Sequence, residues 1–290
     1  MKTLQFQLTE DNRVTLTAYL IEDSREMTNW AKRPAVLVLP GGGYSYTSDR
    51  EADPVALSYL AQGFHAFVLR YSTAEHGQFP APFIDASRAM SLIRKQADEW
   101  HLDPDRLAVC GFSAGGHLAA SLGTMWNDPK LIEAAGIEAG ENKPNALILG
   151  YPVITCGDDT AGHLNNMWKI AMGDQPSEQM QRQLSCELHA CAHTPPAFIF
   201  HTYMDNVVPV ENALLFAQAL AKHDVPFELH IYPNGVHGFS LANEITSTGR
   251  GNMVDRDAAE WLTMSSSWLW RLFNMYEQPE QADLERAKLL

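Results

Sequence analysis

Positive charge is scarce in this sequence. Lysine and arginine number 21 against 35 aspartates and glutamates, which leaves a formal net charge of −14. A surface with this balance repels phosphate backbones, so we expect no nucleic-acid partner. No apolar run is long enough to span a bilayer, and the N-terminus has neither the apolar region nor the cleavage site of a secretory signal. We therefore expect a chain that neither enters a membrane nor is exported.

Cysteine is the second shortage, with four residues in the chain. None of them has partners at the spacings of a metal site, and the neighbouring Cys186 and Cys191 lack matching His or Cys ligands. Cys110 lies in an apolar run, where we expect a small buried hydrophobe. We predict no bound metal and a reducing, cytoplasmic location.

Internal repeats and low-complexity linkers are also missing. The 290 residues, 46% of them hydrophobic, are enough for one large α/β domain or two small ones. Alternating apolar residues on both sides of Asp11-Asn12 predict an antiparallel hairpin. Short apolar runs then predict strands at 34–40, 64–69, 107–110, 146–151, 197–202 and 227–232, and helical spacing predicts helices at 51–62, 81–100, 118–122, 210–223 and 255–273. This order predicts a mostly parallel, eight-stranded sheet with helices on both faces.

One segment, 155–195, interrupts the alternation of strands and helices. It is rich in polar residues, Gly, His and Met, with short helices predicted near 163–171 and 177–189. Two interpretations stay open: an insertion over the sheet that lines or caps a pocket, or an excursion that only covers core. We predict that residues 1–277 form a single domain containing this insertion, followed by a polar tail over 278–290.

The most informative stretch is Gly111-Phe-Ser-Ala-Gly115, which lies between a predicted strand and a predicted helix. This is a G-x-S-x-G match in the strand–turn–helix context that the motif requires. A sharp turn would aim the hydroxyl of Ser113 out of the sheet, and the flanking glycines have no Cβ to clash there. Such matches also arise by chance, as an ordinary glycine-rich turn, so other residues have to decide.

A serine hydroxyl needs a base to become a nucleophile, and the base needs a third group to orient it. His237 directly follows the last predicted strand, and Asp205 directly follows the strand before it. The order Ser113, Asp205, His237 is the one found in α/β-hydrolases. Each residue alone has a structural explanation, as a loop histidine or as a helix cap. Three such residues after three strand ends, in this order, favour a Ser-His-Asp triad.

A glycine-rich loop supplies the remaining element. Gly41-Gly-Gly43 directly follows a buried strand, and its backbone N–H groups can converge with that of Ala114 on a developing oxyanion. The bulky residues Tyr44, Tyr151 and Pro152, together with Met167 and Trp168 of the 155–195 segment, are our candidates for the walls of the substrate pocket.

Taken together, these stretches resemble an α/β-hydrolase serine esterase of the hormone-sensitive-lipase-like and acetyl-xylan-esterase-like group. The matching stretches are Leu39–Tyr44, Asp103–Ala119, the Asp205 loop and Val236–Phe239. The resemblance implies an α/β-hydrolase fold, Gly42, Gly43 and Ala114 as oxyanion donors, and short acyl groups, often acetyl on sugars. Many relatives have His where this chain has Pro40, which puts the anchoring of the glycine loop in question.

We therefore predict a carboxylic ester hydrolase that works without a cofactor or metal on a small-molecule ester. Two alternatives remain: an amidase or peptidase-type hydrolase, such as an aryl formamidase, and a non-catalytic binding protein of the same fold. The alcohol half of the substrate and the oligomeric state, a homo-oligomer included, stay open.

Overall fold

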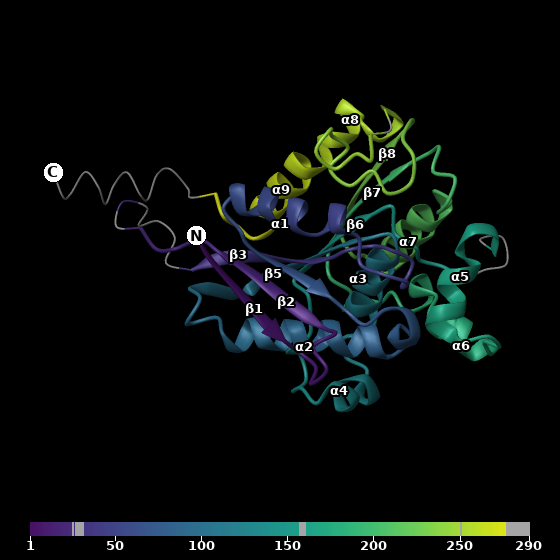
Figure 1. The fold of residues 1–290 in the computed structure, drawn as a ribbon, viewed down its shortest axis with the longest axis horizontal. Helices are drawn as coiled ribbons and strands as arrows, with labels where there is room; N and C mark the ends of the chain where they lie inside the picture. Colours follow the sequence, from purple (N-terminus) through teal and green to yellow (C-terminus); the bar gives the residue numbers. More distant parts are fainter. Residues whose placement is uncertain (25, 27–31, 157–160, 250, 277–290) are drawn as a thin grey trace.

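The computed structural model describes residues 1–24, 26, 32–156, 161–249 and 251–276. The predicted polar tail over 278–290 lies outside the described residues. Figure 1 shows the described chain as a twisted sheet with helices on both sides. No helix in the described part of the chain is long and apolar enough to cross a membrane.

Eight strands form one sheet in the order β1-β2-β4-β3-β5-β6-β7-β8. β1 pairs with β2 and β2 with β4 in antiparallel fashion, whereas every pairing from β4 to β8 is parallel. This confirms the predicted mostly parallel sheet and the leading hairpin. The strands are β1 Lys2–Gln7, β2 Thr15–Leu20, β3 Arg33–Leu39, β4 His65–Arg70, β5 Leu102–Phe112, β6 Ala146–Gly150, β7 Ala197–Thr202 and β8 Phe227–Tyr232.

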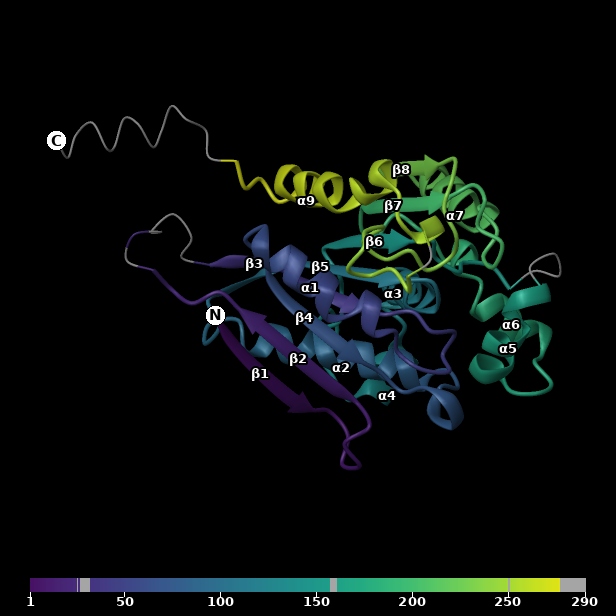
Figure 2. The same ribbon diagram turned by 45° about the horizontal axis from the view of Figure 1, so that its top comes forward.

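Helices cover the two faces of the sheet with separate apolar cores. One core joins the sheet to α1 and α9, and the other joins it to α2, α3 and α7 (Figure 2). The helices are α1 Asp53–Ala61, α2 Ala81–Lys95, α3 Ala114–Met125, α4 Pro129–Ala135, α5 Ala161–Met172, α6 Glu178–Gln183, α7 Glu211–Lys222, α8 Arg256–Ala259 and α9 Trp261–Leu272.

The burial of each strand explains its sequence pattern. All residues of β3, β6 and β7 are buried, because helices cover both of their faces, and their sequences are accordingly almost continuous in apolar residues. β1 lies at the edge of the sheet, and the residues along it are exposed or only partly buried. At the other side of the sheet, Trp261 of α9 stacks on Phe200 of β7 with ring centroids 4.4 Å apart.

Helices differ from the prediction in several places. The helix expected over 118–122 spans Ala114–Met125, the one expected over 177–189 ends at Gln183, and the one expected over 255–273 is divided into α8 and α9. The predicted helix over 81–100 ends at Lys95, and turns follow. The apolar pattern continues past this end because Trp100 stacks on Phe67 in the core without being helical. The helix α4 was missed, although Asp128 caps it by accepting the N–H of Lys130 and Leu131.

The predicted insertion over 155–195 contains α5, α6 and a short 3₁₀ turn, Cys186–Leu188. Both views place α5 and α6 together beyond one end of the sheet (Figures 1 and 2). Leu164 and Met167 of α5 line the cavity described below, and like Met172 and Leu184 they also belong to the buried core. The segment therefore both lines the pocket and covers core.

Candidate active site

Ser113 lies on the sharp turn between β5 and α3. Its backbone has φ 53° and ψ −117°, a strained conformation for a residue with a side chain. A Cβ at Gly111 would lie 2.2 Å from the carbonyl oxygen of Gly115, and one at Gly115 would lie 2.1 Å from that of Leu39. Both glycines are therefore required for the close approach of α3 to the sheet, as the spacing predicted.

A continuous hydrogen-bonded chain joins the three residues selected from the sequence. Ser113 Oγ lies 2.8 Å from Nε2 of His237, and Nδ1 of His237 lies 2.7 Å from Oδ2 of Asp205. The serine follows β5, the aspartate follows β7 and the histidine follows β8. The carboxyl ends of parallel strands share one edge of the sheet, which brings together residues that are 124 and 32 positions apart.

The carboxylate of Asp205 is held as an anion. Its side chain is fully buried, and Oδ1 accepts the backbone N–H groups of Val207 and Val208, both at 2.9 Å. Burial alone would raise the pKa of Asp205, but hydrogen bonds with His201 and His237 outweigh it and hold that pKa well below its ordinary value. A buried anion with directed partners fixes the orientation of the His237 ring.

His201 is a partner that sequence reasoning missed. Its Nε2 lies 3.0 Å from the carbonyl oxygen of Val208 and 3.4 Å from Oδ2 of Asp205. The side chain is fully buried on β7. Its position four residues before Asp205, within an apolar strand, is the signal that could have identified it.

The glycine loop after β3 faces the serine. Gly42 has φ 127° and Gly43 has φ 61°, values that glycine adopts without strain, and both residues line the cavity beside Ser113. Ala114 is the first residue of α3, so the helix does not use its N–H. The structure thus brings the three predicted oxyanion donors to the same side of the sheet as the serine.

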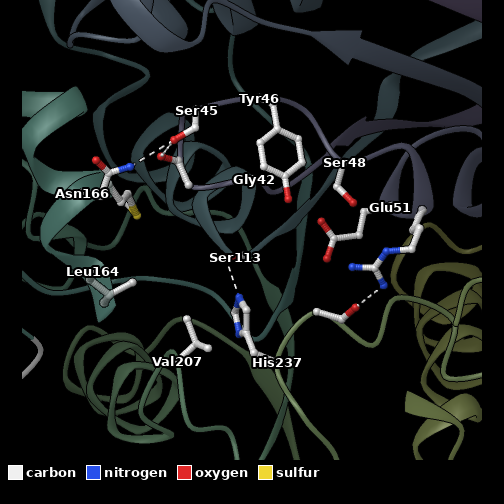
Figure 3. Close-up of a pocket in the computed structure, with 14 residues that line it drawn as sticks. Gly42, Ser45, Tyr46, Ser48, Glu51, Ser113, Leu164, Asn166, Val207 and His237 are labelled. Atoms are coloured by element: carbon white, nitrogen blue, oxygen red, sulfur yellow. Dashed lines mark hydrogen bonds between the residues drawn. The ribbon is translucent and has the colours of Figure 1, made fainter. Parts of the chain in front are cut away.

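A cavity of about 260 Å³ opens over Ser113 (Figure 3). One side carries the apolar side chains of α5 and the Asp205 loop, and the other carries hydroxyl and charged groups that follow β3. The lining residues are Gly42, Gly43, Ser45, Tyr46, Ser48, Arg50, Glu51, Ser113, Leu164, Asn166, Met167, Val207, His237 and Gly238. Asn166 of α5 donates to Ser45 Oγ at 3.3 Å, so the insertion is tied to the glycine loop.

Of the predicted wall residues, Met167 lines this cavity, whereas Tyr44, Tyr151, Pro152 and Trp168 do not. Tyr44 is buried and its hydroxyl meets Nδ1 of His117 at 2.8 Å. Tyr151 is fully buried, and Pro152 packs against Gly116 of α3. We chose Tyr44, Tyr151 and Pro152 because each lies close to a strand end, but their side chains pack into the core beneath the site.

Tyr46, Arg50 and Glu51 occupy the wall instead, and sequence reasoning assigned them no role. Tyr46 is 61% exposed at the glycine loop, whereas Glu51 is 3% exposed. The sequence signal that could have identified Arg50 and Glu51 is a pair of adjacent charged residues shortly after a glycine loop.

No group of three or more His, Cys, Asp or Glu residues in the described ranges could hold a metal ion.

Two protein-family models match this sequence. The family model BD-FAE matches residues 25–220, and the Dienelactone hydrolase family model matches residues 181–269. The acetylxylan esterase of Xylanibacter ruminicola is 30% identical over 83% of this chain and 46% of its own length. The chain spans less than half the length of the first curated relatives that it matches.

Solved structures resemble the chain over nearly its whole length. MGS-M1, an α/β hydrolase enzyme from a Medee basin deep-sea metagenome library, is 39% identical with a TM-score of 0.76, covering 94% of this chain and 98% of its own. An acetyl ester-xyloside bifunctional hydrolase from Caldicellulosiruptor lactoaceticus is 32% identical with a TM-score of 0.78, covering 95% and 97%. The family match over more than half of the sequence and this shared fold show that the chain belongs to the BD-FAE family and is an α/β-hydrolase.

Proposed function

We propose that this protein is a serine carboxylesterase that hydrolyses short-chain, acetyl-type esters. The observation that carries the proposal is the hydrogen-bonded chain from Asp205 through His237 to Ser113, which opens into a cavity. Relatives named as an acetylxylan esterase and an acetyl ester-xyloside bifunctional hydrolase support the same chemistry.

The reaction proceeds in two halves. Ser113 Oγ attacks the ester carbonyl while His237 Nε2 takes its proton, and the carbonyl π electrons move to the oxygen. The backbone N–H groups of Gly42, Gly43 and Ala114 stabilise that oxyanion. Collapse of the intermediate breaks the bond to the alcohol oxygen, which leaves with the proton from His237. Water then attacks the acyl-enzyme by the same route and releases the acid.

Asp205 sets the protonation of the imidazole. Its carboxylate accepts the Nδ1 proton of His237, which leaves the Nε2 lone pair facing the serine. The anion also stabilises the imidazolium that forms when the serine proton moves. The lowered pKa of Asp205 supports this role, because the carboxylate stays ionised wherever the histidine can act as a base.

The two sides of the cavity suggest where the two halves of the ester lie. Leu164 and Val207 lie on one side of the cavity (Figure 3), and together with Met167, which also lines it, they provide apolar surface that suits a short acyl chain. Tyr46 and Ser48 lie on the opposite side (Figure 3), and Arg50 also lines the cavity; their hydroxyl and guanidinium groups suit a polyhydroxylated alcohol. We include acetylated sugars in the proposed substrate class on this basis.

The proposal is tested by comparing wild type with Ser113→Ala on p-nitrophenyl acetate and with a fluorophosphonate probe. We expect loss of both turnover and labelling in Ser113→Ala with an unchanged melting temperature, since Ala fits the same turn. Ser58→Ala is the matched control, because its hydroxyl donates to a helix carbonyl of Pro54 on α1.

Retained labelling of Ser113→Ala would reject the serine mechanism. Matched ester and anilide substrates separate the esterase from the amidase alternative. If wild type is not labelled by the fluorophosphonate and hydrolyses no ester, the result would favour a non-catalytic binding protein.

A further inference from the structure

Glu51 is a buried carboxylate in the wall of the catalytic cavity. Its side chain lines the same cavity as Ser113 and His237. Burying a carboxylate is costly unless donors surround it. Two donors contact the Glu51 carboxylate: the N–H of Gly41 donates to Oε2 at 2.9 Å, and the hydroxyl of Tyr151 donates to Oε1 at 2.7 Å. The two oxygens of one side chain thus bind two different segments.

The first segment is the glycine loop. Gly41 directly precedes Gly42 and Gly43, whose N–H groups we assign to the oxyanion. A Cβ at Gly41 would lie 2.7 Å from Glu51 Oε2 and 3.0 Å from the Cβ of Ser113, so carboxylate, loop and serine pack without a gap. Glu51 therefore fixes the start of the loop at the side of the serine.

The second segment carries the imidazole. The hydroxyl of Tyr151 accepts the N–H of Ser240 at 2.9 Å, three residues after His237. The ring of Tyr151 also packs edge-on against the ring of His237, with centroids 5.1 Å apart. Burial, together with the neighbouring Glu51 carboxylate, raises the pKa of Tyr151, so its hydroxyl keeps the proton that it donates.

Arg50, next to Glu51, strengthens the same connection. Its Nη1 donates to the carbonyl oxygen of Gly238 at 2.7 Å, and its own carbonyl accepts the hydroxyl of Ser240 at 2.6 Å. Arg50 and Glu51 belong to the 3₁₀ turn Asp49–Glu51, which therefore lies between the loop after β3 and the loop after β8 (Figure 3).

We propose that Glu51 is a positioning residue that holds the glycine loop and the His237 loop at a fixed separation. The backbone donors and the imidazole then reach the same acyl group. This inference rests on the proposed esterase function. The role requires a carboxylate, which accepts hydrogen bonds at both oxygens. The amide of Gln accepts at only one, so it would either face the N–H of Gly41 with a donor or leave the Tyr151 hydroxyl, which already accepts the N–H of Ser240, without an acceptor for its proton.

The test measures kcat and KM for p-nitrophenyl acetate with Glu51→Gln, Tyr151→Phe and the double variant. Rates are expressed per site titrated with a fluorophosphonate, which removes the contribution of unfolded protein. The matched control is Asp49→Asn, on the same turn, because the Asp49 carboxylate is 86% exposed and pairs with Arg70.

We expect kcat to fall on the order of 10²-fold in each single variant, the effect of a misplacement of about 1 Å, with KM nearly unchanged. Binding of phenylboronic acid, which forms a tetrahedral adduct on serine, should weaken in parallel, because the donors act on the tetrahedral state. The double variant should be no slower than the slower single variant, since both break one connection. Asp49→Asn should keep the wild-type kcat.

Several outcomes would overturn the inference. These are a wild-type kcat in Glu51→Gln, a loss confined to KM, or losses that multiply in the double variant. Tyr151→Phe, which removes only a hydroxyl, keeps the test decisive if Glu51→Gln does not fold. Wild type without ester turnover would reject the proposed function and this inference with it, whereas active wild type with unaffected variants would reject the inference alone.

Discussion

Histidines with the same chemistry serve different purposes in this chain because their partners differ. His237 lies between a serine and a carboxylate, with 16% of its side chain exposed, where it can exchange protons. His117, four residues after Ser113, is buried between the hydroxyl of Tyr44 and the carbonyl oxygen of Leu184, each at 2.8 Å. Neutral His117 satisfies both partners, accepting at Nδ1 and donating from Nε2.

This environment makes His117 a source of acid sensitivity. Burial lowers the pKa of His117 to about 4 from an unfolded value of 6.5, so the folded protein binds fewer protons than the unfolded chain between these values. The contribution of neutral His117 to the free energy of unfolding is therefore fully present above pH 6.5 and is lost as the pH falls toward 4. Between pH 7 and pH 5 the loss from this residue should be on the order of 2 kcal/mol.

Urea unfolding of wild type and His117→Gln across this range measures the effect. Gln can donate to Leu184 and accept from Tyr44 without titrating, so its unfolding free energy should depend less on pH. Parallel pH profiles for the two proteins would show that His117 does not carry the effect.

Elements were predictable where the sequence determines burial on its own. The strands β7 and β8 match their predicted ranges, because short apolar runs bounded by turns have few alternative structures. Helix ends depend on local capping and on tertiary contacts, which explains why the helix expected over 81–100 stops at Lys95. The turn at Ser113 was predictable because a close approach of two elements leaves a glycine signature in the sequence.

That close approach makes a prediction about α3. Gly115→Ala would place a methyl group 2.1 Å from the carbonyl oxygen of Leu39 and 2.4 Å from that of Pro40. Neither backbone atom can move without displacing β3, so we expect a loss of at least about 3 kcal/mol in unfolding free energy, the upper range for overpacking. Gly251→Ala is the control, because a Cβ there meets no atom within 4 Å.

Thermal unfolding of both variants, with expression in the soluble fraction, provides the measurement. If Gly115→Ala melts at the same temperature as the Gly251→Ala control, α3 can shift away from β3, and the prediction from the packing of the turn is wrong.

At the scale of the molecule, the cavity unites segments from Gly42 to Gly238 that only the folded sheet brings together. The sequence could identify Ser113, Asp205 and His237 because each follows a strand at the same edge. It identified Met167 as a wall residue but misplaced Tyr44 and Tyr151, since a side chain next to a strand end points into the cavity or into the core according to the packing around it. Tyr44 and Tyr151 point into the core, and Leu164 of the insertion points into the cavity.

The insertion should therefore set the acyl-chain length. Leu164 and Met167 close the apolar side of a cavity of about 260 Å³. We expect kcat/KM for p-nitrophenyl esters from C2 to C12 to fall beyond roughly C4, because one methylene too many costs about 1–3 kcal/mol of discrimination. Leu164→Ala and Met167→Ala should each move the optimum to longer chains, since a vacated wall can bury added methylenes at about 0.8 kcal/mol each.

Leu188→Ala is the matched control for this series, because Leu188 belongs to the same insertion but is 52% exposed and does not line the cavity. Its chain-length profile should match that of wild type. If wild type itself prefers C8 or longer, the insertion forms an acyl channel and the acetyl-type assignment fails. If Leu188→Ala shifts the chain-length optimum as much as Leu164→Ala does, the optimum reflects the stability of the whole insertion. A change remote from the cavity wall would then have altered the acyl-chain preference as much as a change within the wall.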